Sequence, residues 1–311
     1  MTLRAPRAHW LGACLLVAAA LACGFLLANA TGTGGATSPV TKVAACAPPA
    51  PGTHRVPVAA NRIPVVLHVP PGVPPAGGRR PLVLVLPGAG QSASAIASYT
   101  GYSKLADMRG FLVAYPTATG NPTYWNISGQ EPERIDDVAY LRSVIRKMSG
   151  PAACADPQRV SVTGVSNGGG MAARLGCESA DLLAAVAPVA GGYSSLPKCK
   201  PGRPLPLLEI HGLRDGVVPY NGKGPTHAGA LGPFLAGWRS RDGCTTASTR
   251  TWPAHNVLEF RWHCAQGRQI VHDRVYDAEH GWPGGSSLTP FSSTLRTWEF
   301  LSAFRAPVQA R

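Results

Sequence analysis

One segment of this chain of 311 residues constrains its fold more than any other: residues 160–171, VSVTGVSNGGGM. Its β-branched first half predicts a strand, and its second half predicts the start of a helix. Between them, Gly164, Ser166 and Gly168 spell G-x-S-x-G. A serine at such a junction occupies a sharp, strained turn, and flanking glycines let strand and helix approach closely. The five residues alone also fit a glycine-rich loop, so the surroundings must decide.

Strand-like and helix-like segments alternate along the rest of the chain. Several of the expected strands are continuously apolar, which is typical of parallel strands covered on both faces. The alternation predicts an α/β domain with a mostly parallel sheet, whose sites lie at the carboxyl ends of the strands. The expected strands are 63–69, 81–86, 111–115, 159–163, 184–189, 206–211 and 269–276, and the expected helices are about 93–108, 135–149, 167–178, 228–241 and 290–304.

A serine is a weak nucleophile unless a base removes its proton and an acid orients that base. In this strand–turn–helix setting the chain order is serine, acid, histidine. Asp215 follows the expected strand 206–211, and His280 lies in a Gly/Pro-rich loop after the last expected strand. We therefore expect Ser166 as nucleophile, Asp215 as acid and His280 as base.

Other titratable residues fit these roles less well. His272 falls inside a strand pattern, His263 adjoins a cysteine, and His211 is expected to be a hydrogen-bonding group at a strand end. Asp277 is the second candidate for the acid because it is close to His280 in sequence. It does not follow a strand in the way Asp215 does.

An acyl-transfer site also needs donors for the oxyanion. The backbone N–H of Asn167, directly after the serine, is the first expected donor. Ala89 is the second, because it lies in the PGAGQ loop after the strand 81–86.

The amino terminus has the layout of a secretory signal peptide over residues 1–30, with two arginines, an apolar run and a small-x-small cleavage signal. Retention as a membrane anchor, or lipid attachment at Cys14 or Cys23, is the alternative. Residues 31–57 are rich in Thr, Gly, Ala and Pro and are expected to be a flexible segment. Residues 58–306 then form one catalytic domain.

Cleavage after residue 30 reduces eight cysteines to six, and an even number in an exported chain predicts disulfides. The pairing Cys244–Cys264 is expected first, then Cys177–Cys199 and Cys46–Cys154. A zinc site is the competing interpretation, but the spacing of the ligand types does not match one, and we expect no metal.

The chain carries 29 basic and 16 acidic residues, a formal net charge of +13, of which residues 1–30 contribute +2. A basic exported protein is suited to adhesion to an anionic polymer, although the charge also serves solubility. Nucleic-acid binding is not expected, because no run of Lys or Arg exceeds two residues.

The chain resembles the polyhydroxybutyrate depolymerase/feruloyl esterase family of secreted α/β-hydrolases over about residues 60–300. Four segments carry the resemblance: LVLVLPGAGQSA, RVSVTGVSNGGGMAARLGCESADLLAAVAPVAG, LLEIHGLRDGVVPYNG and EHGWPGG. It implies an α/β-hydrolase fold and the same roles for Ser166, Asp215 and His280. The family often has a His-Gly pair where Pro87 and Gly88 stand here, which affects the expected oxyanion loop.

These features predict a secreted serine esterase that needs no cofactor and acts on short-chain esters, hydroxyalkanoate oligomers, or feruloyl or acetyl esters of polysaccharides. The ester substrate is expected to be a small molecule, a polymer or material derived from plant cell walls. Trp125 and Trp282 are expected either to line its pocket or to pack in the core. The alternatives are a secreted serine peptidase and a catalytically silent hydrolase-fold protein that binds cell walls.

Overall fold

The computed structural model describes residues 46, 49–72, 78–128, 136–150, 153–193, 196, 202–223, 231–287 and 291–307. All of them belong to one compact unit, Ala44–Arg311. The expected signal peptide at residues 1–30 and most of the expected flexible segment lie outside the described residues, so both stay predictions.

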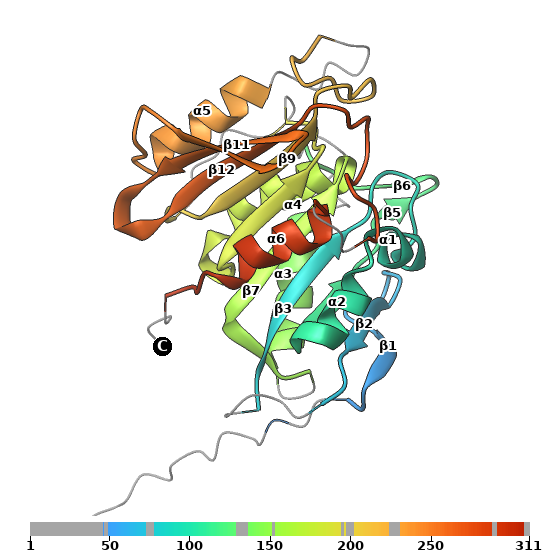
Figure 1. The fold of residues 1–311 in the computed structure, drawn as a ribbon. Coiled ribbons are helices and arrows are strands. Elements are labelled where there is room, and N and C mark those ends of the chain that lie inside the picture. Colours follow the sequence, from blue (N-terminus) through green and yellow to red (C-terminus); the bar gives the residue numbers. More distant parts are fainter. Residues whose placement is uncertain are drawn as a thin grey trace, which may run out of the picture. The chain divides into compact units, whose positions relative to one another are not determined.

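A ten-stranded sheet forms the centre of this unit (Figure 1). Its order is β1-β2-β4-β3-β7-β8-β9-β12-β11-β10. The six strands from β4 to β12 are parallel, and antiparallel strands extend the sheet at both edges. The strands are β1 Gly52–Val56, β2 Val65–Val69, β3 Arg80–Leu86, β4 Leu112–Tyr115, β7 Ala155–Val165, β8 Ala185–Val189, β9 Leu207–Gly212, β10 Thr249–Ala254, β11 Val257–His263 and β12 Gln269–Val275. A separate small hairpin joins β5 Thr119–Gly120 to β6 Thr123–Tyr124.

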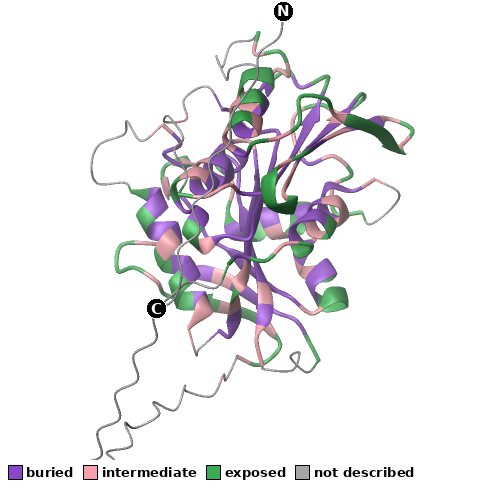
Figure 2. Ribbon diagram, turned by 90° about the vertical axis from the view of Figure 1, so that its left-hand side faces the viewer, coloured by how far each residue is buried: buried purple, intermediate pink, exposed green. Residues whose placement is uncertain are grey.

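Helices cover both faces of the sheet, as the apolar strands predict. On one face lie α3 Asp137–Ser149, α4 Asn167–Glu178 and α5 Leu231–Arg241; on the other lie α1 Ala93–Thr100, α2 Tyr102–Arg109 and α6 Ser293–Ser302. Short 3-10 helices occur at Ala180–Leu182 and Ala265–Gly267. Figure 2 shows the central strands buried between the two layers.

The sheet has one hydrophobic core on each face, and side chains of β3 alternate between the two. Leu82, Leu84 and Leu86 pack under α3 and α4, whereas Val83 and Val85 pack under α1, α2 and α6. Successive side chains of a strand point to opposite faces, so an unbroken apolar run is needed to fill both layers. The predicted α/β-hydrolase fold with a mostly parallel sheet is confirmed.

The structure differs from the expected elements in three places. The helix expected over 93–108 is two helices, because Gly101 ends α1 in the left-handed conformation with φ 67°. Strand β1 begins at Gly52, inside the segment expected to be flexible, so the ordered fold starts before residue 58. Strands β10 and β11, which extend the sheet beyond β12, are additional.

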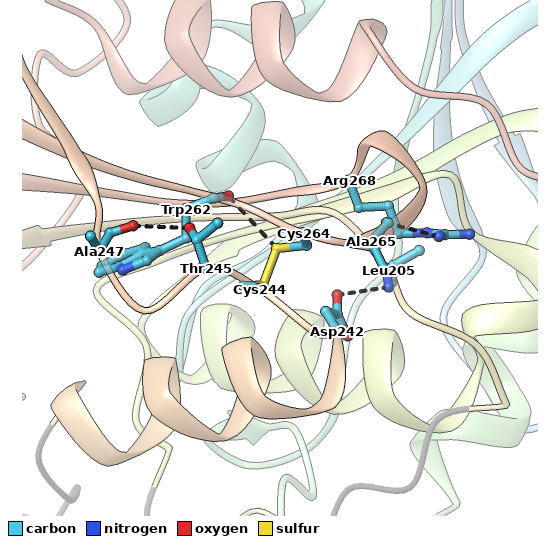
Figure 3. The surroundings of a disulfide bond; sticks show 9 residues. All are labelled: Leu205, Asp242, Cys244, Thr245, Ala247, Trp262, Cys264, Ala265 and Arg268. Carbon is cyan, nitrogen blue, oxygen red and sulfur yellow. Dashed lines mark hydrogen bonds between the residues drawn. A yellow bond between two sulfur atoms is a disulfide. The ribbon is translucent and has the colours of Figure 1, made fainter. Parts of the chain in front are cut away.

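Two disulfides join described residues, and both are pairs expected from the sequence. Cys244, just after α5, is bonded to Cys264 at the end of β11, so the bond ties the helix to the sheet edge (Figure 3). Cys46 is bonded to Cys154, which connects the start of the described chain to the residue before β7. Cys199, the expected partner of Cys177, lies outside the described residues.

Candidate active site

Ser166 lies on the turn between β7 and α4, with φ 57° and ψ −121°. A non-glycine residue with positive φ is strained, and neighbouring structure has to hold it in place. Its N–H donates to the carbonyl of Val189 at the end of β8, 3.0 Å away, and its carbonyl accepts from Gly170 in α4. The turn is therefore fixed by both the adjacent strand and the helix that follows.

The glycines on either side of Ser166 are required by close backbone contacts. A Cβ on Gly164 would lie 2.5 Å from the carbonyl oxygen of Gly168, and a Cβ on Gly168 would lie 2.2 Å from that of Leu86. Neither approach is compatible with a side chain, so both glycines of G-x-S-x-G allow β3, β7 and α4 to meet at this point.

His280 and Asp215 come from loops that follow two adjacent parallel strands, β12 and β9. The Nε2 atom of His280 is 2.9 Å from Ser166 Oγ, and its Nδ1 atom is 2.8 Å from Asp215 Oδ2. The two loops are also joined directly, because the N–H of Arg214 donates to the carbonyl of Ala278. The structure thus brings all three expected residues into one hydrogen-bonded chain.

The surroundings of Asp215 favour its ionised form. The side chain is fully buried, while that of His280 is 19% exposed. The N–H groups of Val217 and Val218 donate to Asp215 Oδ1 at 2.9 and 2.7 Å. Burial raises the pKa of this carboxyl, but hydrogen bonds from His211, His280 and the Val218 N–H outweigh burial and hold the pKa well below its usual range.

The loop after β3 lies beside Ser166 because Leu86 pairs with Gly164 in the parallel register. A Cβ on Gly88 would be 3.5 Å from the Cβ of Ser166. The loop is held by two hydrogen bonds, from the Gly88 N–H to the Gln91 side chain and from the Gly90 N–H to the Thr123 carbonyl, each 2.8 Å long. Within the part of the chain that the structure describes, the N–H groups of Ala89 and Asn167 donate no hydrogen bond, so both are free to meet an oxyanion.

The two tryptophans proposed for the pocket lie in different surroundings. Trp125 is fully buried, its indole N–H donates to the Pro87 carbonyl, and its backbone N–H donates to the Asn167 side chain. It therefore packs in the core behind the loop that follows β3, as the core-packing alternative expects. Trp282 is 3% exposed and its indole N–H donates to Thr294.

A cavity of about 530 Å³ lies beside His280, and Trp282 forms part of its wall. The cavity is also lined by Tyr99 of α1 and by His255 and Asn256, which form the turn between β10 and β11. Asp277, the second candidate for the acid, also borders this cavity, where it accepts a hydrogen bond from Asn256, whereas His280 Nδ1 is hydrogen-bonded to Asp215. The structure therefore places Asp215, and not Asp277, against the histidine.

A buried polar cluster behind Asp215 was not expected from the sequence. His211 and Glu209 of β9 and His272 of β12 are all at most 2% exposed, and the Glu209 carboxylate is hydrogen-bonded to both histidines. The sequence does indicate that Glu209 and His211 lie close together, because they are two residues apart in the expected strand and therefore share a face of the sheet. Among the described residues, no group of three or more His, Cys, Asp or Glu side chains is arranged to hold a metal ion.

The described helices include none that is both long and apolar enough to cross a bilayer.

Comparisons with known proteins show the family and the fold of this chain. Residues 63–194 match the family model described as esterase PHB depolymerase. The putative esterase NocK of Nocardia uniformis subsp. tsuyamanensis is 33% identical over 246 residues, which is 71% of this chain and 70% of NocK. Feruloyl esterase B of Piromyces equi is 32% identical over 235 residues, which is 70% of this chain but only 40% of that protein.

A solved acetyl xylan esterase from Aspergillus awamori has the same fold, with a TM-score of 0.59 at 14% identity, and the match covers 80% of this chain and 98% of that one. The family-model match includes β2 to β8 and the serine turn, and the similarity to NocK extends over more than two thirds of both chains. The chain therefore belongs to the PHB depolymerase family of esterases.

Proposed function

We propose that this protein is an exported serine esterase that hydrolyses carboxylic esters through an acyl-enzyme formed on Ser166. The observation that carries the proposal is the hydrogen-bonded chain from Ser166 Oγ through His280 to Asp215, located at the carboxyl edge of the parallel sheet. The family membership supports the same reaction class.

The geometry gives each residue a distinct task. With Nδ1–H donating to Asp215, His280 presents Nε2 as the acceptor for the Ser166 hydroxyl proton. Ser166 Oγ then attacks the ester carbonyl carbon, and the N–H groups of Ala89 and Asn167 stabilise the oxyanion of the tetrahedral intermediate. Collapse of the intermediate breaks the bond to the alcohol oxygen, which takes the proton from His280.

Deacylation repeats these steps with water in place of serine. His280 removes a proton from water, the hydroxide attacks the acyl carbon, and the proton returns to Ser166 as the acid leaves. Throughout, the buried carboxylate of Asp215 keeps the imidazole in the required tautomer and stabilises its cation.

For the substrate we propose esters of small acyl groups, in the range that spans short-chain esters, hydroxyalkanoate oligomers and the feruloyl or acetyl esters of polysaccharides. The names of the relatives support this range. The two disulfides support an oxidising location outside the cytoplasm. A net charge of +13 is suited to adhesion to anionic polymer.

The test is a substrate panel of p-nitrophenyl esters of increasing chain length, methyl ferulate, acetylated xylan and amorphous polyhydroxybutyrate. We expect hydrolysis of C2–C4 esters by the wild-type protein and none above background by Ser166→Ala. Amides with the same acyl groups test the peptidase alternative, and faster cleavage of the amide than of the ester would favour it. Inactivity on every substrate would favour the silent binding protein.

A further inference from the structure

Glu209 is a buried carboxylate that faces three hydrogen-bond donors. The hydroxyl of Tyr193 donates to its Oε1 at 3.0 Å, and the Nδ1 atoms of His211 and His272 lie 3.0 Å from Oε1 and 2.8 Å from Oε2. Glu209 is fully buried, and His211 is 1% exposed. A buried carboxylate that accepts from several donors is held in its charged form.

The hydrogen bonds of His211 fix its protonation state. Among the described residues, its Nε2 atom faces only acceptors, the carbonyl of Val218 at 2.8 Å and Asp215 Oδ2 at 3.3 Å, so this nitrogen must carry a proton. Its Nδ1 atom faces the Glu209 carboxylate, so it must carry a proton as well. An imidazole with protons on both nitrogens is a cation.

His272 lies on the other side of Glu209, with its Nδ1 atom 2.8 Å from Oε2. The hydroxyl of Tyr220 is 2.7 Å from His272 Nε2 and accepts a hydrogen bond from Arg274 Nε at 3.0 Å. The doubly protonated His211 thus lies between the two carboxylates of Glu209 and Asp215.

The electrostatic balance agrees with this assignment. Burial lowers the pKa of His211, but the charge of Glu209 and the hydrogen bonds with Asp215 and Glu209 outweigh burial and raise the pKa to about 10. Burial likewise raises the pKa of Glu209, but the charge of His211 and the hydrogen bonds from both histidines lower it overall.

We propose that His211 is a buried imidazolium that positions the Asp215 carboxylate for His280, and that Glu209 holds its proton in place. The inference rests on the proposed function, in which Asp215 and His280 belong to the catalytic triad. The titratable groups in contact with His211 are Glu209 on its own strand and Asp215 and Tyr220 in the loop that follows. Tyr193, which follows β8, and His272 of β12 contact Glu209 instead.

Two consequences separate this role from simple packing. His211 is too deeply buried to touch substrate, so its loss should reduce kcat and leave KM nearly unchanged. Its positive charge also lies close to the imidazole of His280, since both rings contact Asp215 Oδ2, and like charges repel. Removing that charge therefore moves the acid limb of the kcat profile to higher pH, by on the order of one unit for charges a few ångströms apart.

The experiment compares His211→Gln and Glu209→Gln with Tyr193→Phe as the matched control. His211→Gln should lower kcat by roughly 10- to 100-fold, the range seen when outer partners of active-site groups are removed at metal sites, with KM within about twofold. Glu209→Gln keeps the imidazole but removes the carboxylate that holds its proton, so it should move the acid limb in the same direction. Tyr193→Phe removes one hydrogen bond and no charge, so its acid limb should coincide with that of the wild type.

A second measurement covers the case in which the variants do not fold. Two-bond ¹H–¹⁵N NMR spectra of the wild-type protein, with imidazole signals assigned from backbone connectivity, distinguish a doubly protonated ring from a neutral one. We expect His211 to be doubly protonated at pH 8. A neutral His211 at that pH, or folded His211→Gln and Glu209→Gln with unshifted acid limbs, would overturn the inference. The NMR result does not depend on activity, so failure of the proposed function would appear separately, as full activity in Ser166→Ala.

Discussion

Replacing Gly168 by alanine tests the close approach on which the serine turn depends. The new Cβ would lie 2.2 Å from the carbonyl oxygen of Leu86 and 2.5 Å from that of Pro87. Since these are backbone atoms, relief requires α4 and the end of β3 to separate by about 0.8 Å to reach even a 3.0 Å contact. That movement shifts the loop carrying Ala89 away from Ser166.

The expected loss follows from the size of this movement. Overpacking of this kind costs about 1–3 kcal/mol of stability, which lowers Tm by roughly 2–10 °C. A misplacement of about 1 Å costs on the order of 100-fold in rate, so kcat/KM should fall far more than stability does. The assay is kcat/KM on p-nitrophenyl butyrate at a temperature where both proteins are folded, together with calorimetric Tm.

Gly232→Ala is the matched control, because Gly232 is also in the first turn of a helix but no atom of the described residues lies within 4 Å of an added Cβ. It should keep wild-type kcat/KM and gain up to about 1 kcal/mol from helix propensity. If Gly168→Ala retained wild-type kcat/KM, the reasoning that the glycine positions the oxyanion loop would be refuted.

Three further predictions concern single interactions. Asp215→Asn should lower kcat by about 10⁴-fold with little change in KM, because His280 loses the carboxylate that fixes its tautomer; steady-state kinetics test this, and a loss below tenfold would contradict it. Replacing both Cys244 and Cys264 by serine should cost about 3 kcal/mol for a bridge across 20 residues, measured by urea denaturation, and unchanged stability would count against it. Burial raises the pKa of Asp242 to about 6, above the value of about 4 in the unfolded chain. The folded protein therefore has its full stability below about pH 4, and loses stability as the pH rises through 6 and the buried carboxyl loses its proton. Asp242→Asn should therefore be about 1–3 kcal/mol more stable than wild type at pH 8 but not at pH 4, and an equal difference at both values would rule this out.

The parts of the fold that could be predicted are those in which the local sequence pattern itself indicates the structure. The apolar run of β3 and the junction at Ser166 are explicit in the sequence, and the structure has both where they were expected. Strand β10 could not be found in this way. Its residues TRTWPA are nearly all exposed at the sheet edge, so no apolar alternation marks them. Two threonines and a tryptophan favour a strand, but the proline in the same short run argues against one.

The candidate site divides in the same manner. The order of Ser166, Asp215 and His280 along the chain, together with the expected strand before each of them, predicts that they meet. The contact between His272 and Glu209 depends instead on the parallel register of β12 with β9, which places these two residues side by side. Sequence pattern gives the face of each side chain but not which strands pair, or in which register, so the cluster behind Asp215 becomes visible only in the folded chain.

The most direct test of the central claim is covalent labelling of Ser166 by a serine-directed phosphonate, followed by intact-protein and peptide mass spectrometry. The account predicts one phosphonyl group per chain, located on the peptide that contains Ser166, with loss of esterase activity in proportion to labelling. Ser166→Ala should take up no label and His280→Ala should label far more slowly. An unlabelled wild-type protein, or a label that persists in Ser166→Ala, would contradict the assignment of Ser166 as the nucleophile.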